Sequence, residues 1–154
     1  MSAAPDTPPY SSYAAIATAY LGGIATVVAV ARRAPAGTAL DLIALSAATF
    51  KASRTLSRER VASFVRQPFV EGDAETGEGE RPAGEGVQRA LGELVTCPRC
   101  IGAWTAAGLA SSQVLAPRFG RLLTWSLGAA GANDFLQAAF KALCAKANEL
   151  EDAA

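Results

Sequence analysis

The stretch YAAIATAYLGGIATVVAVA, from Tyr13 to Ala31, carries no charged residue and is followed directly by Arg32 and Arg33. In a helix these 19 residues would extend roughly 28 Å, close to the hydrocarbon thickness of a bilayer. A secretory signal peptide is the alternative, but its positive charges precede the apolar run, whereas here they follow it. The stretch therefore predicts a membrane-spanning helix, preceded by a disordered, Pro-rich leader over residues 1–12.

The composition agrees with a small membrane protein of bacterial type. The chain has 154 residues, enough for one domain, and only 18% of them are charged. Small residues, above all Ala, dominate the apolar content and suit helices that pack closely in lipid. Lys plus Arg and Asp plus Glu balance at 14 each, so nothing favours a nucleic-acid partner. The sequence has no His, which removes the usual general base and the commonest zinc ligand.

A second, shorter apolar stretch extends over residues 38–50 and leads into a basic segment. Thr38 and Asp41 have the spacing of a capping box, which favours Asp41 as a first-turn residue over a buried functional acid. Apolar residues and arginines then follow each other until Gln67-Pro68 ends the helix. We expect this amphipathic segment to lie on anionic headgroups through Arg54, Arg58, Arg60 and Arg66.

An acidic, Gly-rich stretch, EGDAETGEGERPAGEG at residues 71–86, follows. It contains no large apolar side chain to offset the entropy of ordering, so it predicts a flexible loop over residues 70–90. This loop would separate an N-terminal membrane region, 13–69, from a C-terminal one, 91–147, with an acidic tail at 148–154. None of its glycines has the strand–helix context of a phosphate-binding loop, so we assign no nucleotide site.

The C-terminal region contains two apolar segments, 101–116 and 122–143, separated by the charged break PRFGR at 117–121. So short a connection predicts a tight antiparallel helical hairpin. With the two segments before the loop, this gives an all-α, polytopic membrane helical bundle of about four apolar helices. Small residues four apart predict close helix contacts, at Gly102, Ala106 and Ala110 and at Thr124, Gly128 and Ala132.

The basic residues indicate how this bundle is oriented. If all four segments cross, ten Lys and Arg residues lie inside and four outside; if residues 38–50 only dip into the bilayer, the ratio is twelve to two. The positive-inside rule favours both arrangements over their inversions, and both place the acidic loop in the cytoplasm. The predicted location is the bacterial inner membrane, with several crossings.

Three segments carry a family resemblance: SRTLSRERVASFVRQPFVE at 53–71, RALGELVTCPRCIGAW at 89–104 and NDFLQAAFKAL at 133–143. Their order resembles the uncharacterised bacterial membrane-protein family catalogued as domain of unknown function 1360, over roughly residues 41–143. The family's first core helix is similar to residues 39–53, which favours four crossings and makes 13–31 an added helix. The resemblance implies an architecture and no activity.

The motif CPRC at residues 97–100 is the strongest chemical candidate. Thr96 or Cys97 can cap the next helix, and a thiol there, beside Arg99, should have a lowered pKa. The pair fits a redox site, although the strand–helix context of thioredoxin-like proteins is missing. It also fits a zinc or iron site, if Cys144 returns to the same membrane face or two chains each donate a pair. A plain helix cap is the interpretation that the sequence favours.

Asp134 is the second candidate, because a carboxylate in the middle of an apolar helix is costly and usually faces a partner or water. It fits a proton or ion relay, but an interhelical hydrogen bond or ion pair is the favoured interpretation. Arg121 lies too far along the helix to meet it, and Lys141 is two turns away. Asn133 and Asp41 are the other polar residues that we expect within apolar segments.

These patterns favour a non-enzymatic membrane protein that scaffolds or assembles, as a homo-oligomer or with other membrane proteins, in contact with the lipid bilayer. The first alternative is a thiol- or metal-dependent membrane protein with Cys97, Cys100 and Cys144 as candidate ligands. The second is a small ion or proton transporter that uses Asp134. No cofactor is expected beyond a zinc or iron ion at Cys97 and Cys100.

Overall fold

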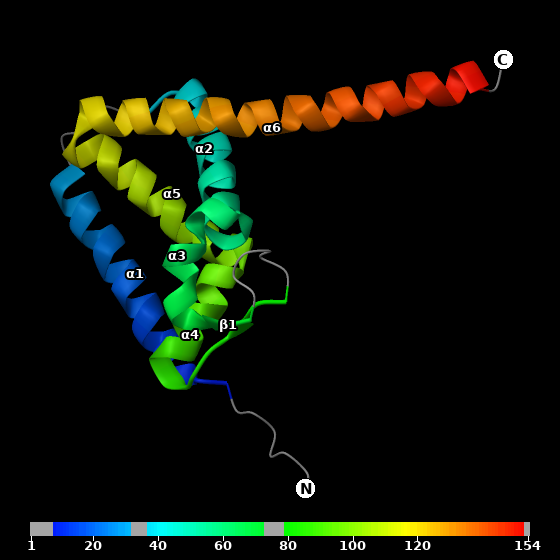
Figure 1. Ribbon diagram of the computed structural model, residues 1–154. Helices are drawn as coiled ribbons and strands as arrows, with labels where there is room; N and C mark the ends of the chain where they lie inside the picture. Colours follow the sequence, from blue (N-terminus) through cyan, green and yellow to red (C-terminus); the bar gives the residue numbers. More distant parts are fainter. Residues whose placement is uncertain (1–7, 32–36, 73–78, 153–154) are drawn as a thin grey trace, which may run out of the picture.

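The computed structural model of the protein describes residues 8–31, 37–72 and 79–152, and most of these residues are helical (Figure 1). The all-α prediction is confirmed, with 87% of the structure in helices. The long helices are α1 (Tyr10–Val30), α2 (Ala39–Arg58), α4 (Gly86–Thr96), α5 (Pro98–Leu115) and α6 (Pro117–Asp152). Between α2 and α4 lie the short helices η2 (Arg60–Ala62), α3 (Ser63–Arg66) and η3 (Gln67–Phe69), and the strands β1 (Val70–Glu71) and β2 (Arg81–Pro82).

Helix α1 contains the charge-free stretch from which the membrane prediction came. Among the described residues it is the one helix long and apolar enough to cross a membrane. It leans against α4 and α5, with the ring of Tyr20 edge-on to that of Trp104 at 5.2 Å between centroids. Its first turn lies beside α4, because the Tyr13 hydroxyl donates to the carboxylate of Glu93. The first turn of α1 and helix α4 therefore lie at the same end of the molecule (Figure 1).

Helix α2 begins with the predicted capping box and forms the centre of the fold. The Thr38 amide donates to the Asp41 carboxylate at 2.9 Å, and the Asp41 amide donates to the Thr38 hydroxyl at 3.2 Å. Two otherwise unsatisfied amides at the helix start are thereby paired. Asp41 is thus a capping residue. The helix runs beyond the predicted apolar stretch to Arg58 and packs against both α5 and α6.

The predicted tight hairpin is wrong in its geometry. Only Ala116 separates α5 from α6, because Pro117 is tolerated in the first turn of a helix and the PRFGR segment is helical. Helix α6 lies along α5 near this corner, where Gln113 donates to Thr124 at 2.9 Å. It then passes across α2, and its C-terminal part extends beyond the body as an arm, defined here as residues 136–152 (Figure 1).

Small residues allow α6 to approach its neighbours closely. A Cβ built on Gly128 would lie 2.9 Å from the carbonyl oxygen of Ala44, and one on Gly131 would overlap that of Ala47. The predicted small-residue face is confirmed at Thr124 and Gly128, which are buried. Ala132, the third residue predicted for this face, is exposed, and Gly131 contacts α2 in its place.

The region predicted as a flexible loop is ordered at both of its ends. Val70 pairs with Pro82 and Glu71 with Arg81, giving a two-stranded antiparallel ladder that the sequence did not predict. Gly92 of α4 fits against this ladder, where an added Cβ would lie 3.0 Å from Pro82. Residues 73–78, in the middle of the predicted loop, lie outside the described part of the chain.

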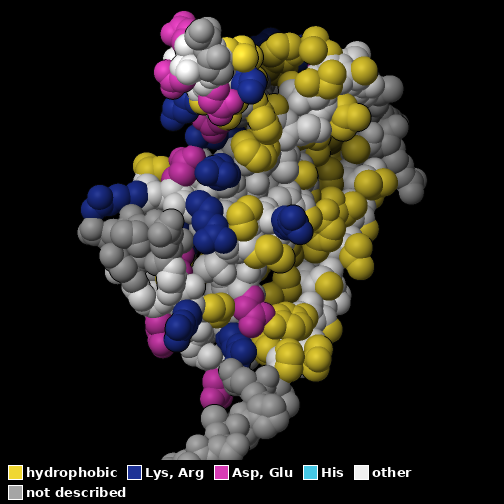
Figure 2. Space-filling view, turned by 90° about the vertical axis from the view of Figure 1, so that its right-hand side faces the viewer, with side chains coloured by type: hydrophobic (Ala, Val, Ile, Leu, Met, Phe, Trp, Pro, Cys, Tyr) yellow, Lys and Arg dark blue, Asp and Glu magenta, His cyan; other side chains and the backbone are white. Residues whose placement is uncertain are grey.

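Burial in the described chain is inverted relative to a soluble domain. Its largest fully buried side chains are Arg66, Thr124 and Ser57, and Leu109 is the one large apolar residue among the buried positions. Large apolar side chains instead face outward at 20 positions, including Leu21, Leu42 and Phe135. On the face of the molecule seen in Figure 2, hydrophobic side chains gather along one side and most of the charged side chains lie on the other.

Candidate functional site

The CPRC motif lies at the junction between α4 and α5, with its two thiols in contact. Cys97 is the residue between the helices and caps α5: its sulfur accepts from the amide of Cys100 at 3.3 Å, and Pro98 occupies the first helical position. The predicted cap is therefore confirmed, with Cys97 in that position. The Cys100 thiol donates to the Cys97 sulfur at 2.7 Å. The backbone of one helical turn holds both sulfurs on the same side.

The contact separates the acidities of the two thiols. The hydrogen bond from Cys100, together with the helix-terminal amides and Arg99, lowers the pKa of Cys97 below the usual thiol value. The same hydrogen bond and partial burial raise the pKa of Cys100 to about 11. Cys97 is therefore the more acidic thiol of the pair, and Cys100 is the less acidic one.

Cys144 does not join this pair. It is exposed on the α6 arm, and no group of three His, Cys, Asp or Glu side chains in the described ranges is placed to hold a metal ion. The expectation of three thiolates from one chain required an antiparallel hairpin that returns Cys144 to the CPRC motif. Helix α6 instead extends away from the junction between α4 and α5 (Figure 1). A metal at Cys97 and Cys100 would need ligands from elsewhere, because zinc in proteins takes four.

An apolar pocket of about 420 Å³ adjoins the thiol pair. Helices α1, α4 and α5 line it, and the lining includes Cys100 and the contacting rings of Tyr20 and Trp104. Its polar edge is Glu93, which accepts from the Arg89 guanidinium at 3.2 Å as well as from Tyr13. Sequence reasoning did not find this pocket, because its walls come from residues far apart in the chain.

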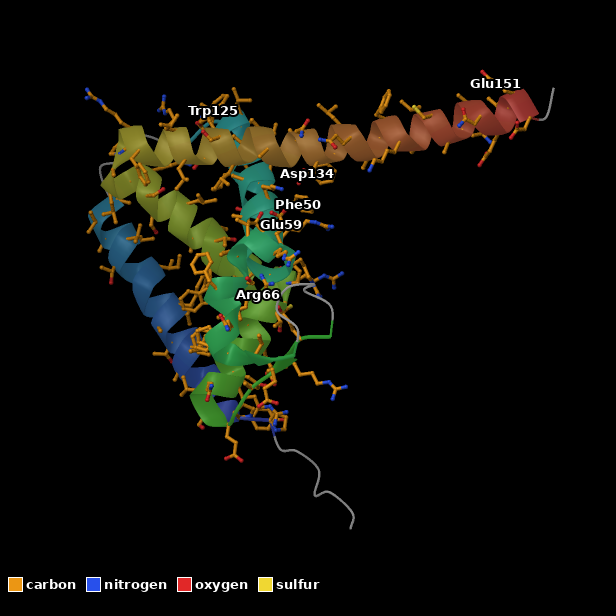
Figure 3. All side chains as sticks on the ribbon, in the orientation of Figure 1. Phe50, Glu59, Arg66, Trp125, Asp134 and Glu151 are labelled. Carbon is orange, nitrogen blue, oxygen red and sulfur yellow. The ribbon has the colours of Figure 1, made fainter. Side chains whose placement is uncertain are left out.

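Asp134 forms an ion pair across the α2–α6 contact. Its carboxylate lies 3.1 Å from the Lys51 ammonium, which also lies 2.9 Å from the carboxylate of Glu59. Figure 3 shows Asp134 on α6, with Phe50 of α2 close to it and Glu59 at the end of α2. The favoured prediction of a paired acid is confirmed, with Lys51 as the partner that the sequence did not reveal. Asn133 is exposed.

The basic segment divides into exposed arginines and one buried arginine. Arg66 is fully buried: its guanidinium pairs with the Glu80 carboxylate at 3.0 Å and donates to the carbonyls of Leu56 at 2.9 Å and Glu59 at 3.1 Å. Its expected place on a lipid surface is therefore wrong. The Arg66 side chain, labelled in Figure 3, thereby connects the end of α2 to Glu80 within the acidic stretch. The remaining three, Arg54, Arg58 and Arg60, are exposed.

Comparison with known protein families gives one match. Residues 44–140 match the family described as protein of unknown function DUF1360. The chain belongs to this family. The match covers α2 through most of α6, so it contains the thiol pair, the Arg66–Glu80 pair and the Lys51–Asp134 contact. Helix α1, the start of α2 and residues 141–152, which make up most of the α6 arm, lie outside it.

The resemblance drawn from the sequence is thus confirmed. No curated protein and no solved structure matches the chain. A function for this protein is therefore proposed from the arrangement of its own residues.

Proposed function

We propose that this protein is an integral, multi-pass protein of the bacterial cytoplasmic membrane with a non-enzymatic role in assembly. The inverted burial carries the proposal. In water, outward Leu, Ile and Phe side chains would be costly, whereas in lipid they are solvated and helices pack through small residues. The apolar parts of α1, α2 up to residue 50, α5 from residue 101 and the first half of α6 then face acyl chains.

The position of the first turn of α1 supports one of the two topologies. Tyr13 contacts Glu93, and Ser12 lies near Gly86, so the start of α1 is on the same side as α4 and the thiol pair. A chain that crosses along α1 and returns along α2 meets this requirement. The exposed arginines at the end of α2 and just after it, Arg54, Arg58 and Arg60, then lie on the same side, which the positive-inside rule makes cytoplasmic.

Thiol labelling in intact cells tests this topology. In a variant without native cysteines, Pro8→Cys should resist a membrane-impermeant maleimide until the cells are permeabilised. Arg118→Cys, at the opposite end of α5, should react at once. Labelling of Pro8→Cys from outside would overturn the proposed arrangement.

The α6 arm supports an assembly role. Its apolar residues Leu136, Phe140, Leu143, Ala147 and Leu150 follow each other at alternating spacings of four and three, the seam of a coiled coil. The four large side chains among them are at least 61% exposed. With these residues at the a and d positions, Lys146 falls at g and Glu151 at e. Lys146 of one chain then faces Glu151 of a parallel second copy, which makes that copy the partner we propose.

The mass of the protein in detergent tests this assembly. We expect the native chain to form a dimer and Leu143→Glu to be monomeric, because a buried charge at the seam is costly. Ala138→Glu, on the opposite face of the same arm, should leave the dimer intact. A monomeric native chain, or equal masses for all three proteins, would contradict the assembly role and leave the membrane proposal standing.

A metal-binding membrane protein is the second candidate, and the contact between Cys97 and Cys100 is the observation that favours it. Two chains that each donated this pair would supply the four thiolates that zinc prefers. Purified native protein should then contain one metal ion per two chains, and the Cys97→Ser/Cys100→Ser variant none. Equal metal content near zero in both would exclude this candidate. A transporter that uses Asp134 is less favoured, because Lys51 already balances that acid.

A further inference from the structure

The two sulfur atoms of the CPRC motif need little movement to form a covalent bond. They lie 2.7 Å apart, and a disulfide bond is about 2.05 Å long. Cys97 at the cap and Cys100 three residues later are held on one side of the first turn of α5, so closure requires no rearrangement of the helices. We propose that Cys97 and Cys100 are a redox-active dithiol that exchanges with disulfide substrates. This chemistry does not depend on the assembly role.

The environment of the pair suits exchange better than a purely structural role. Cys100 is exposed and Cys97 is half-buried, so a substrate can reach both sulfurs. A buried structural thiol would be shielded and inert. The apolar pocket beside Cys100, with Trp104 on its wall, offers a surface on which the apolar part of a substrate can rest during exchange.

The electrostatics assign different tasks to the two thiols. Cys97 lies at the N-terminus of an 18-residue helix beside Arg99, where amide dipoles and the guanidinium stabilise a thiolate. Cys97 is therefore the attacking group. Cys100 keeps its proton until Cys97 is consumed, because its hydrogen bond to Cys97, its partial burial and the neighbouring sulfur charge raise its pKa.

The exchange proceeds in two balanced steps. The Cys97 thiolate attacks one sulfur of the substrate disulfide, whose S–S bond breaks, and the first substrate thiolate leaves with the proton that Cys97 released. Cys100 then loses its proton and attacks the Cys97 sulfur, and the mixed disulfide breaks as the second substrate thiolate leaves and takes that proton. Two protein thiols are oxidised to one disulfide, and one substrate disulfide is reduced to two thiols.

The third cysteine provides a matched background for the experiment. Purified full-length Cys144→Ser protein in detergent micelles is equilibrated in glutathione buffers that range from reducing to oxidising. Free thiols are then trapped with maleimide and counted by intact mass. We expect the chain to change from two trapped thiols to none in a single reversible transition, with a loss of 2 Da for the disulfide.

Two single variants establish the order of attack. Ser is a good helix cap, so Cys97→Ser should keep the fold. Cys100→Ser should stop at one glutathione adduct on Cys97, formed at least tenfold faster than any adduct on Cys100 in Cys97→Ser. The proposal is overturned if both thiols survive the most oxidising buffer, if oxidation yields only linked dimers, or if bound zinc protects the thiols until it is chelated.

Discussion

Arg66 is the residue on which the end of α2 depends. Its guanidinium satisfies two carbonyls of the last turn, from Leu56 and Glu59, and the carboxylate of Glu80, and none of the side chain is exposed. Removing one partner of a buried ion pair leaves an uncompensated charge. We therefore expect Arg66→Met to lower the free energy of unfolding in micelles by about 3–5 kcal/mol.

Thermal unfolding followed by circular dichroism would measure this loss. Arg54→Met removes an exposed arginine of the same segment and should change stability by no more than about 0.5 kcal/mol. Arg66→Met combined with Glu80→Leu removes both charges and should recover most of the loss. Equal stabilities of Arg66→Met and Arg54→Met would show that the buried pair does not hold this region.

The acidity of Cys97 is a second property set by single residues. The hydrogen bond from Cys100 is the largest cause of its lowered pKa, so Cys100→Ala should move this pKa upward. In the Cys144→Ser background, the rate of Cys97 alkylation rises with the thiolate fraction. Its midpoint should therefore lie at higher pH in Cys100→Ala than in Cys100→Ser, whose hydroxyl can still donate. Identical midpoints for the two variants would contradict this assignment.

At the scale of helices, the contact between α2 and α6 depends on glycine. A side chain at Gly131 would overlap the backbone of Ala47, so Gly131→Ala should separate the helices and cost about 1–3 kcal/mol. Gly108 on α5 has open space around its Cβ position, and Gly108→Ala should be neutral or slightly stabilising. Thermal unfolding of both variants tests the contact, and a stable Gly131→Ala protein would refute it.

The elements show how far local patterns determine this fold. The capping box of Thr38 and Asp41 and the cap at Cys97 depend on residues within one helical turn, so the sequence alone predicted them. The direction of α6 depends on which partner its glycines meet, and α2 lies some 85 residues earlier in the chain. A pattern along one helix cannot reveal that partner, so the hairpin prediction failed.

The candidate sites follow the same division. The thiol pair and the acid of the ion pair stood out as unusual residue types in their segments. The surroundings of these residues could not be predicted, because Lys51 and the walls of the pocket come from other helices. The burial of Arg66 could not be predicted for another reason. The other arginines of its segment are exposed, and its partner Glu80 lies in an acidic stretch whose composition predicts a loop.

For the whole molecule, the proposed membrane environment rests on an interior of small and polar residues with an apolar exterior. Leu21 on α1 and Leu42 on α2 are 65% and 64% exposed, and Arg54, further along α2, is exposed as well. Water would reach all three positions in an isolated soluble chain. In a bilayer it would reach Arg54 alone, since acyl chains cover the two leucines.

Cysteine accessibility in native membranes tests this difference most directly. Leu21→Cys, Leu42→Cys and Arg54→Cys are introduced one at a time into the chain without native cysteines, and inverted membrane vesicles are treated with a water-soluble maleimide. We predict rapid labelling of Arg54→Cys, and no labelling of the two leucine positions until the vesicles are dissolved in denaturant. Equal labelling of all three positions in intact vesicles would contradict the proposal that the apolar exterior faces lipid.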